Sequence, residues 1–367
     1  MGTGGRGPDA RAPGTRLEKT VSAILPQKVL HDLAGLWATM GGHADSGTET
    51  GASAGVLRAC TMTLVVLLDD LPGAEAAAVQ QRAGEAIAMV MREHPSRTIV
   101  IHLRPSGDAA LEAHVSAQCW MPFGKSQQIC CEQIDITATE AALSDVPGVV
   151  LPLAAPDLPL VVWCRPARLF RLPAFAGFFP LAGKVILDSA GFPDTGAILG
   201  DLATAIASGK RVCDLAWTRL TRRRELIAQI FENPVYLSQI ATVTDVRIRC
   251  TGSAIPVSAY YFAAWLKQCL ESGGAEPRLQ FVSEGGEGRG ELAVVEISGR
   301  NHVEVELVEG AVFEARVDTL ANRTALPVFT DDALLREELG LIGHDPVYEK
   351  TVGLAAKLAS GWEMEFH

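Results

Sequence analysis

Four arginines lie within six positions of the segment DLAWTRLTRRRELIAQIFE, which spans residues 214–232. They are Arg219, Arg222, Arg223 and Arg224, and Trp217 lies just before them. Guanidinium groups bind phosphate and carboxylate equally well, so the cluster favours either an anion site or a surface for an acidic partner. The alternative is a solvated helix face on which Glu225 or Glu232 neutralises the arginines.

The same segment has the spacing of an amphipathic helix. Asp214 is a residue type that caps helices, and apolar residues recur at helical spacing from Leu220 to Phe231, which predicts a helix over 215–231. Cations near the positive end of a helix dipole cost about 0.3–1 kcal/mol each at exposed sites, unless an anion or acidic surface faces them. Tryptophan and arginine are also enriched among interface anchors. We therefore expect a partner- or anion-binding surface made of Trp217, Arg219, Arg222 and Arg223.

A second basic cluster, Arg165 and Arg168, follows the predicted strand 160–164. His94 stands in HPSR (94–97), at the junction of a predicted helix with a buried strand, where a purely structural turn is the alternative. In an open α/β sheet, ligands bind at the carboxyl ends of the strands. If these residues line one pocket with Arg219, the alternative function is a phosphosugar-binding or phosphosugar-converting protein.

The eight cysteines include no C-x-x-C pair and no Cys/His cluster at zinc spacing, so we expect no metal site. Most are expected to be small buried residues in a reducing compartment, and Cys131 and Cys213 are the candidates for accessible, redox-active thiols. Neither a nucleophile elbow, a P-loop nor H-E-x-x-H occurs. The hexad Gly2–Gly7 matches G-x-G-x-x-G, but no strand is predicted before it and no helix after it. We therefore expect no catalytic residues and no cofactor.

Composition indicates a globular chain of two domains. The 367 residues are 48% hydrophobic and 20% charged, and the net charge of −11 argues against general binding to nucleic acid or to anionic membranes. No apolar run is long enough to span a bilayer, and the first fifteen residues lack the apolar core of a secretory signal, which predicts a cytoplasmic protein.

The predicted order of elements gives the fold class. Continuous apolar strands at 60–68 and 98–103 flank an Ala-rich helix at 74–92, a pattern typical of parallel strands covered by helices. Further strands are predicted at 111–120, 127–136, 160–164 and from 184, with a short helix near 139–146 and a helix near 195–207. The first domain is thus predicted to be α/β, with a mixed, largely parallel sheet and flanking helices.

Beyond residue 240 the pattern changes to alternating strands with one wet face. Strands are predicted at 243–250, 278–283, 291–298, 302–308 and 311–318, and helices at 257–270, 331–340 and 346–360. We therefore predict a smaller α+β domain with antiparallel strands. The predicted organisation is a disordered tail (1–15), an N-terminal helical segment (16–40), a flexible linker (41–55), an α/β domain (56–238) and an α+β domain (239–367).

Three blocks resemble the OpcA family of glucose-6-phosphate dehydrogenase assembly proteins. They are LPLAAPDLPLVVWC (151–164), KVILDSAGF (184–192) and DLAWTRLTRRRELIAQIFE (214–232), and EHPSRTIVI (93–101) matches the block before them. The resemblance covers most of residues 56–330 in order and spacing, and D-L-x-W-T-R-L-T is its most specific part. Two departures stand out: family members usually carry Pro-Trp where this chain has Arg222 and Arg223, and often a second Trp where it has Cys164.

The resemblance implies a non-enzymatic accessory protein of the oxidative pentose phosphate pathway. Such a protein binds glucose-6-phosphate dehydrogenase and promotes its assembled, active form, and the family offers no catalytic residues to carry over. In photosynthetic members, the redox state of cysteines is linked to this regulation, which the cysteine spacing here does not establish. If the Trp at position 223 lies in a partner contact in the family, this chain has altered that contact.

Overall fold

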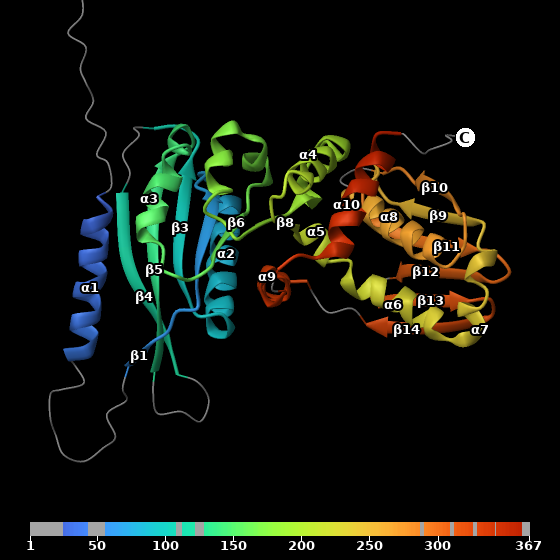
Figure 1. Cartoon of the computed structure of the whole chain (residues 1–367), viewed down its shortest axis with the longest axis horizontal. Helices are drawn as coiled ribbons and strands as arrows, with labels where there is room; N and C mark the ends of the chain where they lie inside the picture. The colour runs from blue at the N-terminus through green and yellow to red at the C-terminus, as the bar shows by residue number, and fades with distance from the viewer. Residues whose placement is uncertain are drawn as a thin grey trace, which may run out of the picture.

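The computed structural model describes residues 25–42, 56–107, 112–121, 128–286, 290–308, 312–325, 329–341 and 343–361. Within these residues the chain builds two β-sheets, each with helices packed against it (Figure 1). Three predictions fall wholly or mostly outside the described residues: the tail at 1–15, the glycine-rich hexad at 2–7 and the linker at 41–55.

The first sheet, which we call sheet A, contains eight strands of the described chain in the order β1-β5-β3-β2-β6-β7-β8, with β4 paired to β5 at one edge. All its pairings are parallel except that of β4 with β5. This confirms the predicted mixed, largely parallel sheet. The strands are β1 (Val56–Arg58), β2 (Met62–Asp69), β3 (Ser96–Arg104), β4 (Glu112–Trp120), β5 (Gln128–Thr139), β6 (Leu160–Cys164), β7 (Lys184–Leu187) and β8 (Val212–Asp214).

Helices cover both faces of sheet A, which explains why its central strands are continuously apolar. Along β2, Val65 and Leu67 belong to one apolar cluster, whereas Leu64 and Val66 belong to a second cluster with α2. The helices are α1 (Pro26–Gly42), α2 (Ala74–Glu93), α3 (Val146–Leu153) and α4 (Thr195–Ala207), with 3₁₀ turns η1 (Glu140–Ala142), η2 (Ala167–Arg171), η3 (Pro173–Phe178) and η4 (Ser189–Gly191). The position predicted for the helix near 139–146 is wrong. The structure has the 3₁₀ turn η1 at 140–142, and helix α3 begins only at Val146.

The second sheet, sheet B, has the order β10-β9-β11-β12-β13-β14. Only β9 and β10 pair in parallel, so the predicted antiparallel α+β part is confirmed. Its strands are β9 (Asp245–Cys250), β10 (Arg278–Ser283), β11 (Leu292–Ser298), β12 (His302–Val308), β13 (Val312–Val317) and β14 (Leu320–Ala325). The segments between and beside them are α5 (Leu215–Thr218), α6 (Thr221–Glu232), α7 (Pro234–Leu237), η5 (Ile240–Thr242) and α8 (Val257–Ser272).

Two C-terminal helices join the parts of the molecule. Helix α9 (Asp331–Gly340) packs on α2, and its Leu334 and Leu335 complete the second apolar cluster of sheet A. Helix α10 (Pro346–Ala359) packs between α4 and α8 (Figure 1). The predicted domain boundary at 238/239 stays a prediction, and the structure adds that the last helices contact elements on both sides of it.

Candidate functional site

The arginine-rich segment forms two short helices rather than one. The Asp214 side chain caps α5, as predicted, by accepting a hydrogen bond from the Ala216 N–H. The Leu220 N–H then bonds to the Trp217 carbonyl three residues back, which tightens the chain, and α6 begins at Thr221. This break spreads the arginines over several sides of the segment. The prediction of one continuous helix over 215–231 is therefore wrong.

Asp214 is the centre of a buried polar cluster where β7, β8 and α8 meet. One carboxylate oxygen accepts the N–H groups of Ser189 (3.0 Å) and Ala216 (2.9 Å). The other accepts the hydroxyls of Ser189 and Tyr261, the latter at 2.8 Å. Burial, with a smaller contribution from Asp188, raises the pKa of Asp214 to about 6. Since Ser189 is fully buried, the cluster holds elements together and presents no nucleophile to a substrate.

Trp217 lies inside the molecule with only 3% of its surface exposed. Its ring packs against Tyr261 and Tyr348, and its N–H donates to Asp345 at 3.2 Å. The Arg224 guanidinium lies 3.4 Å from the ring centroid. The expectation of an exposed tryptophan is therefore wrong, because this side chain fills the space between α5, α8 and α10.

Arg223 is also buried, although sequence analysis placed it on the surface. Its guanidinium donates to the Leu292 carbonyl at 2.9 Å and lies 4.5 Å from the centroid of the Phe313 ring. Burial lowers the pKa of Arg223 to about 10, so it stays protonated at neutral pH. The cation at position 223 is thus packed against the chain's own sheet B.

Arg219 and Arg222 differ sharply in their surroundings. Arg219 makes a bidentate contact with Asp188, at 2.7 and 2.6 Å. Arg222 has 60% of its side chain exposed and, among the described residues, its ion pair is with Glu225 on the same helix. An exposed pair of this kind contributes little to stability, so Arg222 is the arginine of the predicted set that remains open to another molecule.

The second basic cluster lies at the carboxyl ends of the strands, as expected, but each arginine faces an acid. Arg165 contacts Asp331 at 2.6 Å, and Arg168 bridges Asp69 (2.6 Å) and Glu140 (2.7 Å). Burial raises the pKa of Asp69, and the contact with Arg168 opposes that shift. These positive charges are therefore balanced within the chain.

His94 does not join these arginines. It follows α2 and precedes β3, whereas Arg165 follows β6 and Arg219 follows β8. Because these strands run parallel, their starts and ends lie at opposite edges of sheet A. The predicted pocket combining His94 with the arginines does not form.

The carboxyl edge of sheet A does not fit a dinucleotide. The order β5-β3-β2-β6-β7-β8 is that of dinucleotide-binding sheets, which hold the pyrophosphate where the order reverses beside the first strand. Here β2 ends in Asp69 and Asp70, followed by Leu71-Pro72-Gly73 in place of a glycine-rich turn. Arg104 and Arg168 hold the two carboxylates at that point. The acids and the proline occupy the place that a pyrophosphate requires.

Sequence reasoning missed the acids at the centre of these contacts. Asp69, Glu140 and Asp188 all stand at or just after a strand end, which is the signal that could have identified them, whereas Asp214 was predicted as a helix cap but not as the centre of a buried cluster. In the described part of the chain, no group of three or more His, Cys, Asp or Glu residues could hold a metal ion. Nor does any described helix have the length and apolarity to cross a membrane.

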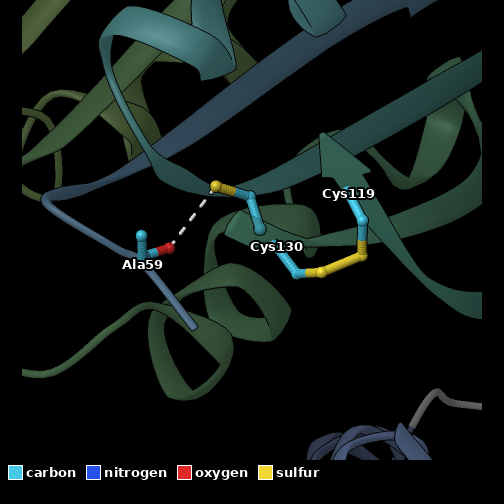
Figure 2. Close-up of a disulfide and its surroundings, with 4 residues drawn as sticks. Ala59, Cys119 and Cys130 are labelled. Carbon is cyan, nitrogen blue, oxygen red and sulfur yellow. Dashed lines mark hydrogen bonds between the residues drawn. A yellow bond between two sulfur atoms is a disulfide. The ribbon is translucent and has the colours of Figure 1, made fainter. Parts of the chain in front are cut away.

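The cysteines include one disulfide that was not predicted. Cys119 and Cys130 face each other across β4 and β5, with Cα atoms 4.1 Å apart (Figure 2). The neighbouring Cys131 is buried and donates to the Ala59 carbonyl at 3.4 Å. Burial raises the pKa of Cys131 to about 11 and that of Cys213 still further. A thiol is nucleophilic only as the thiolate, so neither has the environment of a reactive cysteine.

We expect Cys131 and Cys213 to react with iodoacetamide at neutral pH at least about tenfold more slowly than the exposed Cys269. Peptide mass spectrometry over a time course gives the three rates. Labelling in urea is the control, since unfolding should remove the differences. Equal rates in the folded protein would contradict the burial described here and would restore both thiols as redox candidates.

The matching family models and the curated relatives agree with one another. A family model described as the glucose-6-phosphate dehydrogenase subunit N-terminal domain matches residues 87–204, and one for the C-terminal domain of that subunit matches 210–352. A protein from a Synechocystis species, named as a putative OxPP cycle protein OpcA, is 30% identical over 169 residues, which cover 45% of this chain and 35% of that protein. One of the same name from Nostoc punctiforme is 29% identical over 193 residues, covering 52% and 40%. The chain thus spans less than half of the length of these relatives.

Solved structures give weaker matches. An aldose-aldose oxidoreductase from Caulobacter crescentus has a TM-score of 0.45 at 11% identity, covering 82% of this chain and 96% of that one. A dehydrogenase from Chromobacterium violaceum has a TM-score of 0.45 at 8% identity, with 82% and 94% covered.

Proposed function

Because the chain belongs to the OpcA family of glucose-6-phosphate dehydrogenase assembly proteins, we propose that it is a non-catalytic accessory protein that binds this dehydrogenase. In this proposal it promotes the assembled, active form of the enzyme in the oxidative pentose phosphate pathway. The observation that carries the proposal is the match of the two family models, which together reach from residue 87 to residue 352. A cytoplasmic location, with the dehydrogenase, is part of the same proposal.

The geometry supports a binding role over a catalytic one. The edge of sheet A where a doubly wound enzyme seats its ligand carries acids held by arginines: Asp69 and Glu140 by Arg168, and Asp188 by Arg219. A sugar phosphate would have to displace these carboxylates to reach the guanidinium groups. That requirement disfavours the alternative of a phosphosugar-binding or phosphosugar-converting protein.

An activator acts through its higher affinity for the active state of its partner, and its effect cannot exceed that difference in affinity. Adding a saturating amount of this protein is therefore expected to raise the kcat/KM of the dehydrogenase for glucose 6-phosphate by about 5-fold or more, equivalent to roughly 1 kcal/mol of coupling. The measurement is the initial rate of nicotinamide reduction with and without the protein. Heat-denatured protein at the same concentration is the control, and an unchanged rate at saturation would refute the activating role.

The same preparation of the protein also tests the alternative, phosphosugar-binding or phosphosugar-converting function. The chain alone, with glucose 6-phosphate and a nicotinamide dinucleotide, is expected to give no turnover. A phosphosugar that binds the folded chain at 100 times its dissociation constant would add about 2.7 kcal/mol of stability, which a thermal shift assay detects easily. Turnover by the chain alone, or a shift of that size with no effect on the dehydrogenase, would favour the phosphosugar function.

A further inference from the structure

A cavity of about 310 Å³ lies between the turns η2 and η3 and helix α4. This volume is at the lower end of the range found for small-molecule sites, roughly 300–1,000 Å³. Such sites combine apolar and aromatic walls with a few charged or polar groups that orient the ligand. The cavity has this composition, because apolar side chains make up most of its wall and its charged residues are Arg171, Asp201 and Lys210.

Two aromatic rings form part of the apolar wall. Phe170 and Phe179 meet edge to face, with ring centroids 6.0 Å apart and ring planes at 81°. Both side chains pack against the larger apolar cluster of the molecule, yet they are only half-buried, and both line the cavity. A planar apolar group fits such a wall, because aromatic rings pack well in offset and edge-to-face arrangements.

Lys210 places a positive charge at the cavity. Its ammonium lies 4.4 Å from the centroid of the Phe179 ring, and no carboxylate of the described chain pairs with it. The ring holds this long side chain beside the cavity, which lowers the entropy cost of using it to bind a ligand. Lys210 also follows the C-terminus of α4, where a cation is favourable even without a ligand, so a control must separate the two effects.

Arg171 keeps hydrogen-bond donors for an anion despite its acidic neighbour. Its Nε lies 2.6 Å from Asp201, and the two side chains are 42% and 41% exposed, so this ion pair is weak. Within the described chain, no hydrogen bond occupies the two terminal amino groups of its guanidinium. Guanidinium donors of this kind bind carboxylate or phosphate. With Lys210, the cavity thus has two cations against one carboxylate, although the whole chain has a net charge of −11.

We propose that this cavity binds a small anion that carries a planar apolar group, such as an aromatic carboxylate or an aromatic phosphate ester. The planar group packs against Phe170 and Phe179. The anionic group accepts hydrogen bonds from the ammonium of Lys210 and from the terminal amino groups of Arg171. This site does not depend on the proposed binding to the dehydrogenase.

Four probes separate the contributions of the ring and of the anion. Phenyl phosphate and benzoate carry both, phenol carries the ring alone, and inorganic phosphate carries the anion alone. Isothermal titration calorimetry with the full chain is expected to give, for the tighter of phenyl phosphate and benzoate, a Kd at least about tenfold lower than for phenol or inorganic phosphate. Equal affinity for phenol or for inorganic phosphate would overturn the proposal, and so would the absence of binding by both phenyl phosphate and benzoate.

Two variants test whether the probes bind at this cavity. Lys210→Gln removes the ammonium, and Thr204→Trp fills the cavity from an exposed position of α4. The matched control is Lys357→Gln, which removes an exposed lysine from the last turn of α10, where it does not line the cavity. The Kd of the tighter probe is expected to rise at least about tenfold for both cavity variants and less than about twofold for the control.

Melting temperatures measured without a probe show whether each variant is folded. Unchanged probe affinity in either folded cavity variant would overturn the assignment of the site. Weaker binding of the dehydrogenase to Lys210→Gln in the absence of any probe would also overturn it, because the cavity would then hold a side chain of the partner protein rather than a small anion.

Discussion

Replacing Asp214 by alanine is expected to lower the free energy of unfolding by about 3–5 kcal/mol. The carboxylate accepts two N–H groups and two hydroxyl groups at a fully buried place. Alanine leaves all four donors without their acceptor, and a buried N–H cannot turn toward water. Because Tyr261 belongs to α8 and Ser189 follows β7, the loss also weakens the joint between the two sheets. Equilibrium unfolding in urea, followed by circular dichroism, measures the effect.

Asp214→Asn is the matched control, and it is expected to cost much less. Its carbonyl oxygen can accept from the N–H groups of Ser189 and Ala216, as one carboxylate oxygen does now. Its amide can donate to the hydroxyl oxygens of Ser189 and Tyr261, because both hydroxyls can rotate and accept. A variant with asparagine that is as unstable as the one with alanine would show that the negative charge itself is required.

The stability of the unaltered protein relative to Asp214→Asn is also expected to depend on pH. Burial raises the pKa of Asp214 from 3.8 to about 6, so between these values the folded chain binds more protons at this site than the unfolded chain. Raising the pH through this window therefore destabilises the native fold at Asp214. Relative to Asp214→Asn, the unaltered protein is expected to lose roughly 3 kcal/mol of stability between about pH 4 and about pH 7. A difference between the two proteins that is flat with pH would contradict the raised pKa.

Replacing Glu132 by alanine should be comparably damaging, at about 3–5 kcal/mol, because it leaves a buried arginine without its counter-ion. Glu132 contacts Arg97 at 2.6 Å, and both side chains are more than nine-tenths buried. The same carboxylate accepts the N–H of Trp37 at 2.6 Å and contacts Arg58 at 2.5 Å. It is thus the polar anchor of α1, which otherwise contributes Val29 and Leu33 to the core.

Urea unfolding measures the stability of the Glu132 variant, and hydrogen exchange measures the docking of α1. Peptides within residues 26–42 are expected to exchange faster in Glu132→Ala, because α1 loses its anchor while most of its surface already faces solvent. The control is Glu140→Ala, which removes a half-exposed partner of Arg168 and should cost less than about 1 kcal/mol. Equal losses of stability in Glu132→Ala and Glu140→Ala would contradict the prediction that burial of the Glu132–Arg97 pair causes the larger effect.

The fold was largely predictable because its strands obey simple patterns. The continuous apolar runs of β2 and β3 and the alternation along β12 each admit one interpretation, and the bounds predicted for β10 and β12 match the structure. Strand β14 was missed because its sequence, LANRTA, buries nothing and so leaves no periodic signal. The disulfide was missed because the register of β4 against β5, which places Cys119 opposite Cys130, cannot be read from the pattern of either strand alone.

The site was less predictable because charged residues are expected on the surface, whereas several charged residues of this site are buried. Arg223 was assigned to the surface by its charge, yet it lies three residues after Leu220 and four before Ile227, on the buried stripe of the helix. That spacing could have revealed its position. The pairing of Arg168 with Asp69 and Glu140 could not be inferred, because it depends on which strands are neighbours in space.

The packing of helix α9 affects how the chain folds during its synthesis on the ribosome. Its Leu334 and Leu335 close the apolar face between α2 and sheet A, and Lys184 of β7 donates to carbonyls of Glu338 and Leu341 near its end. That face of α2 therefore stays open until residues 331–340 have been translated. At typical elongation rates the wait is on the order of ten seconds or more, and during this time nascent-chain chaperones would meet an uncovered apolar surface.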